Sequence, residues 1–103
     1  MRFEFDHDKS AANKQKHGID LKEATALWED DNGLEVLAKD QAGERRLARV
    51  ALLGTKVWFC VYTMRGETVR IISVRRARDY EKEPHNYGVF GSFLPCFLRY
   101  LLL

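Results

Sequence analysis

The pattern of apolar and polar residues divides the chain into an N-terminal part with helices and a longer part with strands. Residues 2–5 alternate polar and apolar side chains, as a short half-buried strand does. Asp6 or Asp8 can then cap a helix that runs from about residue 9 to residue 17. Gly18 follows that helix and is typical of a C-terminal stop.

A second helix is predicted shortly after the first. Asp20 and Glu23 have the spacing of a capping box, which satisfies backbone N–H groups at the start of a helix. Apolar residues then recur at helical spacing: Leu21, Ala24, Leu27 and Trp28. We expect this helix to bury its apolar face and to end in the acidic turn at residues 29–33.

After Gly33 the pattern changes to short strands separated by turns. Strands are predicted at residues 34–38, 45–53, 56–64 and 68–74. The short spacers make sequence neighbours antiparallel, and the nearly continuous apolar run at 57–62 marks the central strand. Since the helices cannot interrupt this meander, they must pack on it. The predicted fold is α+β, with two N-terminal helices on a four- to five-stranded antiparallel sheet.

The composition changes near the C-terminus. Residues 76–83 are charged and compatible with a short C-terminal helix, which Pro84 should end. Residues 86–103 are almost entirely apolar and hold one charged side chain, Arg99. A membrane-spanning helix needs about 20 apolar residues, so we expect no span. We predict a domain at 1–85 followed by an atypical apolar tail at 86–103, which packs poorly or packs on a partner.

Composition narrows the classes of function. The 103 residues suit one domain, and a net charge of only +2 means that any nucleic-acid binding must come from a local basic patch. Cys60 and Cys96 make no disulfide framework, and the charged N-terminus resembles no signal peptide, so we expect a cytoplasmic protein. No group of Cys, His or carboxylate residues has the spacing of a metal site, so we expect no metal or other cofactor.

Positive charge is concentrated along the last predicted strand. Arg70 lies at its start, Arg75 and Arg76 at its end, and Arg78 just beyond it. Arginine presents a planar fork of donors that fits phosphate. On a flat strand Arg75 and Arg76 would point to opposite faces, whereas Arg70 would share the parity of Arg76. A solvated strand end with surface ion pairs is the alternative interpretation.

Several short motifs resemble those of the BrnT family. They are Phe3-Glu4-Phe5-Asp6, Lys16-His17-Gly18-Ile19, Glu44-Arg45-Arg46 and residues 70–77, whose sequence RIISVRRA is close to the usual RIISARRA. The resemblance covers about residues 2–83. It stops there, because family members usually continue in a charged C-terminal helix, which Pro84 and the apolar tail replace here.

The resemblance implies a toxin of a type II toxin–antitoxin system with a RelE-like ribonuclease fold, which arrests translation by cutting RNA. It also implies a BrnA-like antitoxin as partner, with DNA contacted only through that antitoxin. The alternative is a non-catalytic or degenerate toxin that binds an antitoxin or RNA through its basic edge. The altered C-terminus is the reason to keep that alternative.

RNA cleavage without a metal needs a base, cations for the phosphate charge, and an acid. Arg75 and Arg76 are the candidates for stabilising that charge. His17 is a candidate acid or base because its ordinary pKa lies near neutrality, although it can also be a structural helix cap. Glu44 can act as a base or pair with an arginine. Candidates for binding RNA phosphates, each with a solvated alternative, are Lys16, Arg45, Arg70 and Arg78.

Overall fold

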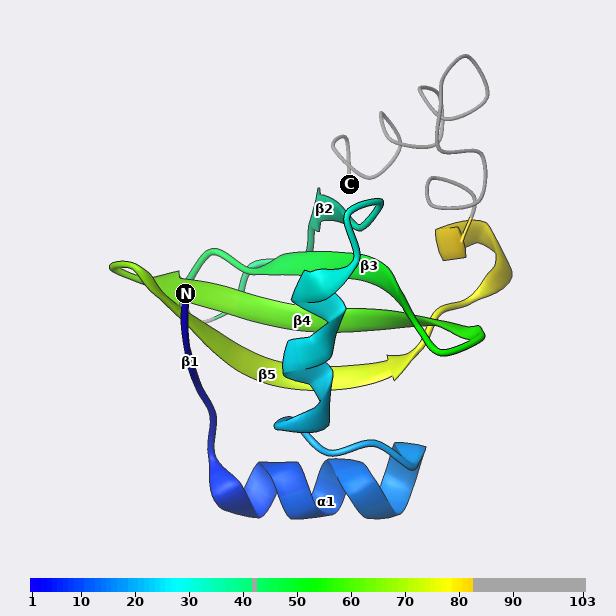
Figure 1. Ribbon diagram of the computed structural model, residues 1–103. Coiled ribbons are helices and arrows are strands. Elements are labelled where there is room, and N and C mark those ends of the chain that lie inside the picture. Colours follow the sequence, from blue (N-terminus) through cyan, green and yellow to red (C-terminus); the bar gives the residue numbers. More distant parts are fainter. Residues whose placement is uncertain (42, 83–103) are drawn as a thin grey trace.

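A computed structural model of the chain describes residues 1–41 and 43–82. Within these ranges it contains one α-helix, α1 (His7–His17), and one 3-10 helix, η1 (Glu23–Glu29). Five strands form a single sheet in the order β1-β5-β4-β3-β2 (Figure 1). Their bounds are β1 Arg2–Glu4, β2 Leu34–Leu37, β3 Leu47–Leu53, β4 Lys56–Arg65 and β5 Thr68–Arg76. The predicted α+β class is therefore confirmed.

The predicted meander is also confirmed, and β4 is the middle strand of the sheet. The prediction of a purely antiparallel sheet was wrong, because β1 pairs in parallel with β5 and places Phe3 opposite Val69. No short turn joins these two strands, so sequence proximity does not set their direction. The side chain of Asn13 holds α1, which follows β1, against β5: it donates to Val74 O (2.8 Å) and accepts from Val74 N (3.2 Å).

The first helix ends at His17 as predicted, but it begins at His7, two residues before the predicted start, because Asp6 rather than Asp8 caps it. The carboxylate of Asp6 accepts hydrogen bonds from the backbone N–H of Asp8 (2.8 Å) and Lys9 (3.1 Å). Gly18 ends the helix in the left-handed conformation, with φ of 81°, which glycine adopts without a steric penalty.

The second helix has the predicted capping box but a different geometry. Glu23 N donates to Asp20 Oδ1 (2.6 Å) and Asp20 N donates to Glu23 Oε1 (3.0 Å). The segment is nevertheless a 3-10 helix rather than an α-helix. Ala24 and Leu27 of η1 are fully buried and spaced by three, as is Leu21 in the turn before it, and a helix with three residues per turn lines up Ala24 and Leu27 toward the sheet.

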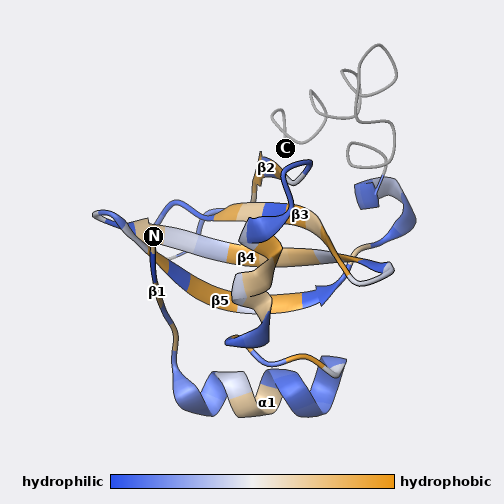
Figure 2. Cartoon of the chain, viewed as in Figure 1, coloured by the Kyte–Doolittle hydropathy of each residue, from blue (hydrophilic) through white to orange (hydrophobic). Residues whose placement is uncertain are grey.

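Apolar residues are buried on both faces of the sheet. On the face that carries the helices, η1 packs on residues such as Cys60 and Ile71. The opposite face has a separate cluster around Val50 and Phe59. Figure 2 shows apolar colour along β3, β4 and β5, whereas α1 is hydrophilic over most of its length. We call these the helix face and the open face.

A β-bulge in β5 decides which face its arginines occupy. Val61 lies opposite Ser73, but Tyr62 lies opposite Ile71, so Ile72 is an extra residue without a partner on β4. Such an insertion shifts the alternation of side chains along the bulged strand.

The bulge overturns one prediction about the arginines and leaves another intact. Arg75 lies opposite Phe59 on the open face, and Arg76 lies opposite Trp58 on the helix face, so their opposite directions are confirmed. The shared parity of Arg70 and Arg76 was wrong, because the inserted Ile72 moves Arg70 to the face of Arg75.

The C-terminal end departs from the prediction as well. β5 extends through Arg76, so the predicted start of the last helix was wrong, and helical backbone begins at Asp79. Predictions about residues 83–103, including the apolar tail and the domain boundary at 85, lie outside the described residues.

Candidate functional site

The open face of the sheet holds a groove with a volume of about 640 Å³. Its floor comes from β4 and β5, including Phe59 and Arg75, and its two sides come from residues 37–41 and 78–81. Because η1 lies in front of the sheet in Figure 1, the groove faces away from the viewer. Four of the residues that line it are basic: Lys39, Arg46, Arg75 and Arg78. This convergence of cations makes the groove the candidate site.

Arg75 is held rigidly in the groove. Its Nη1 and Nη2 atoms each donate to one carboxylate oxygen of Glu81 at 2.8 Å. Its Nη1 also donates to the backbone oxygen of Arg76 (3.1 Å), and its guanidinium carbon lies 4.4 Å from the centre of the Phe59 ring. A bidentate pair combined with ring stacking leaves an arginine few alternative orientations.

Arg46 lines the groove but was not among the predicted site residues. Its Nε is buried and has no hydrogen-bond partner within the described part of the chain. Strand alternation could have found it, because Leu47 packs against the core of the helix face, so the preceding residue points to the open face. Lys39 and Tyr80 were missed as well, and no strand or helix pattern in the sequence marks them.

Of the other predicted residues, only Arg78 reaches the groove. Its Nη1 donates to the hydroxyl of Tyr80 at 3.3 Å. Arg70 lies on the same face of the sheet but outside the groove lining, where it pairs with Glu4 at 2.7 Å. Arg76 is on the helix face, with its guanidinium carbon 5.7 Å from the centre of the Trp58 ring.

The remaining predicted residues also lie outside the groove. Lys16 and His17 are in the last turn of α1, which Asn13 binds to the backbone of Val74 in β5. Glu44 lies 3.7 Å from Arg65, which agrees with the pairing alternative stated for it. Arg45 lines a small hollow with Asp40 and other residues at the end of β2. The structure thus brings Arg75 and Arg78 together and separates them from the other candidates.

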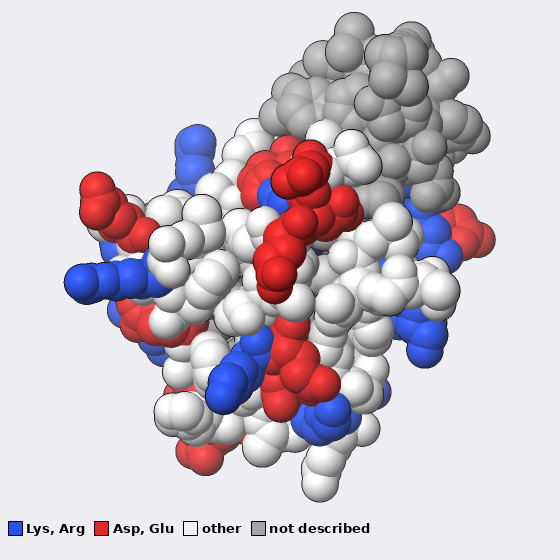
Figure 3. Space-filling model, in the orientation of Figure 1, with Lys and Arg blue, Asp and Glu red and all other residues white. Residues whose placement is uncertain are grey.

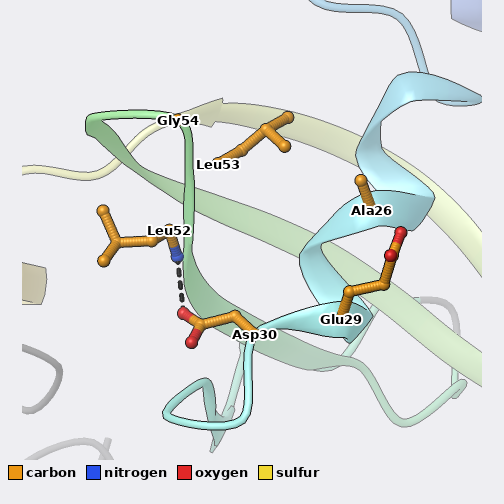
Figure 4. A pocket seen from close by; sticks show the side chains of 6 residues that line it. All are labelled: Ala26, Glu29, Asp30, Leu52, Leu53 and Gly54. Atoms are coloured by element: carbon orange, nitrogen blue, oxygen red, sulfur yellow. Dashed lines mark hydrogen bonds between the residues drawn. The ribbon is translucent and has the colours of Figure 1, made fainter.

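The helix face is more acidic. Acidic side chains gather over η1 and the segments around it, with one basic side chain beside them and others toward the margins (Figure 3). A hollow of about 330 Å³ lies between η1 and the turn that joins β3 to β4 (Figure 4). None of its six lining residues is basic, and the Asp30 carboxylate there accepts from Leu52 N at 2.8 Å. This hollow is therefore unsuited to phosphate.

Neither metal nor thiol chemistry is supported by the described residues. Among residues 1–41 and 43–82, no three His, Cys, Asp or Glu side chains are grouped so that they could hold a metal ion. Cys60 is fully buried, and this burial raises the pKa of its thiol well above the ordinary value, which makes it unreactive. No helix in the described part of the chain is long and apolar enough to cross a membrane.

A comparison with models of protein families shows to which family the chain belongs. The family model described as "Ribonuclease toxin, BrnT, of type II toxin-antitoxin system" matches residues 5–81. The chain belongs to this family. BrnT proteins are ribonuclease toxins, and a type II system pairs such a toxin with a protein antitoxin. The matched range contains every residue that lines the groove. No individual curated protein matches the chain.

Proposed function

We propose that this BrnT protein is a metal-independent endoribonuclease that cuts RNA in the groove on the open face and thereby inhibits translation in the cytoplasm. The observation that supports this most directly is the convergence of four cationic side chains on one groove, with Arg75 fixed by Glu81 and Phe59. We further propose that the sheet is a RelE-like scaffold and that a BrnA-like antitoxin neutralises the toxin.

The groove offers what phosphate chemistry requires. Attack of the 2′-hydroxyl on the neighbouring phosphate builds negative charge on the phosphate oxygens, and fixed cations stabilise that charge. Arg75 provides a planar donor group whose orientation is set before RNA arrives, and Arg46 and Arg78 add charge beside it. The acidic helix face would repel RNA, so the groove is the favoured approach.

We propose that Tyr80 acts on the RNA together with these cations. It is about half exposed at the side of the groove, so its ring can stack on an RNA base. Its hydroxyl lies 3.3 Å from Arg78 Nη1 and is our candidate for proton transfer during cleavage. His17 and Glu44 have no part in this proposal, because both lie outside the groove.

The test is cleavage of a labelled RNA by the purified full chain in EDTA and in magnesium. We expect equal rates in both, products with a 2′,3′-cyclic phosphate end, and no cleavage of the same oligonucleotide with 2′-O-methyl groups. Arg46→Ala should slow cleavage, whereas Arg65→Ala, which removes an exposed arginine outside the groove, should not.

Two results would contradict the proposal. Cleavage that EDTA abolishes would show that a metal takes part. A chain that binds the RNA but leaves it intact, with or without magnesium, would favour the alternative of a toxin that only binds.

The proposed antitoxin has a test of its own. The chain should co-purify with the product of a neighbouring gene, and the complex should not cleave RNA.

A further inference from the structure

Glu81 is a buried carboxylate that the proposed chemistry does not use. Its side chain is only 3% exposed, although it lies at the edge of the groove. It accepts three hydrogen bonds, two from the guanidinium of Arg75 at 2.8 Å and one from the backbone N–H of Arg78 at 2.7 Å. A carboxylate is buried to this extent only where its charge is fully paired.

These contacts connect two elements of the site. Through Arg75, Glu81 binds the end of β5, and through Arg78 N it binds the turn that leads away from that strand. Ala77 N donates to Val57 O (3.0 Å), which keeps the same turn against β4. The guanidinium of Arg75 in the groove and the backbone of Arg78 at its side are therefore both bound to the same carboxylate.

We infer that Glu81 is the positioning residue of the groove, which holds the guanidinium of Arg75 in the orientation that meets the RNA phosphate. This inference rests on the proposed function. Glu81 acts through Arg75 and does not touch the RNA. A guanidinium that loses its bidentate partner keeps its charge but samples several orientations, and misplacement of a catalytic group by about 1 Å can slow a reaction on the order of 100-fold.

The experiment compares Glu81→Gln with Glu35→Gln. Glutamine has the size of glutamate, but at position 81 it lacks the charge and the second oxygen that Arg75 requires. Glu35 is the matched control, because it also pairs with an arginine through both carboxylate oxygens (2.7 and 2.8 Å) but on the helix face. We expect Glu81→Gln to lower kcat by about 10- to 100-fold with little change in KM. Glu35→Gln should lower only the thermal stability.

A second pair of variants separates positioning from a general loss of structure. Glu81→Asp keeps the charge but withdraws the carboxylate by one methylene, and it should give a kcat between those of the parent and Glu81→Gln. In an Arg75→Lys background the effect of Glu81→Gln on kcat should nearly disappear, because lysine has no fork to orient. All rates are measured on protein whose circular dichroism shows it to be folded.

The possible failures can be told apart. A parent chain that does not cleave RNA contradicts the proposed function, and the inference with it. An active parent with Glu81→Gln as active as Glu35→Gln overturns the inference alone. Equal effects of Glu81→Gln in the parent and the Arg75→Lys background would also overturn it. So would a more active variant with a lower KM, since Glu81 would then compete with RNA for Arg75.

Discussion

Two arginine–glutamate pairs, one on each face of the sheet, differ in which of the two side chains is buried. On the helix face the side chain of Arg49 is only 10% exposed, and that of its partner Glu35 is 39% exposed. On the open face the glutamate is the buried member, since Glu81 is 3% exposed and Arg75 is 27% exposed. Both arginines also lie beside an aromatic ring.

The buried member of each pair indicates its role. Arg49 points inward, where its Nε donates to Leu27 O (2.9 Å) and its Nη2 donates to Asp30 O (2.7 Å), so it fastens the end of η1 to β3. Glu81 is anchored in the fold and presents Arg75 to the groove. The Arg49–Glu35 pair therefore holds structure together, whereas the Arg75–Glu81 pair places its arginine in the lining of the groove. Two predictions test this distinction, and a third tests the carboxylates at the helix ends.

The largest effect is expected at the neighbouring arginines of β5. Arg75→Ala should reduce RNA cleavage by about 10² to 10³-fold, the usual effect of losing one donor that stabilises transition-state charge. Arg76→Ala should leave cleavage unchanged, because Arg76 points to the helix face. The measurement is single-turnover cleavage by folded protein. Arg75→Lys is the control for charge, and we expect it to stay slow because lysine lacks the fork. If Arg75→Ala and Arg76→Ala reduced cleavage equally, the open face would not be the only face that takes part in cleavage.

The next effect concerns stability on the helix face. Arg49→Met should lower the free energy of unfolding by about 2–3 kcal/mol, because two backbone oxygens lose their donor. Urea denaturation followed by circular dichroism measures it. Arg65→Met, at an exposed arginine 3.7 Å from Glu44, is the control and should change the unfolding free energy by no more than about 0.5 kcal/mol. Folded Arg49→Met protein should cleave RNA at the parental rate, and a slower rate would contradict a purely structural role.

The smallest effect is expected on the stability that the carboxylates at the starts of α1 and η1 contribute, which acid should reduce. Two backbone N–H groups at the start of α1 lower the pKa of Asp6 below its ordinary value. The Lys14 ammonium, and then the N–H of Asp20, lower the pKa of Glu23. Because both values are lowered in the folded state, the stability they contribute is present above the unfolded pKa and is lost as pH falls through the folded pKa.

Between about pH 5 and pH 3, therefore, the parent should lose stability faster than Asp6→Ser, whose hydroxyl still caps α1 but does not titrate. Both groups are exposed to solvent, so the difference should be small and weaker at high salt. Thermal melts across this pH range measure it. Identical pH profiles for the two proteins would mean that the charge of Asp6 adds nothing to the cap.

Sequence reasoning succeeded where short-range interactions decide the structure. Asp6, Gly18 and the pairing of Asp20 with Glu23 were recognisable as helix ends because each bonds backbone groups only a few residues away. The short turns predicted the meander and its central strand for the same reason. The opposite directions of Arg75 and Arg76 needed only the two-residue period of a strand.

The site itself required contacts between distant segments. The bulge at Ile72 became visible only when β5 was aligned with β4, and it moved Arg70 to the other face of the sheet. The groove combines Arg46, which directly precedes β3, with Arg75 and residues that follow β5. By itself the sequence determined the helix caps, the order of the strands in the meander and the family resemblance. Which arginine faces the groove, and which glutamate holds it there, was decided by tertiary structure, because those contacts depend on strand register and on packing across the sheet.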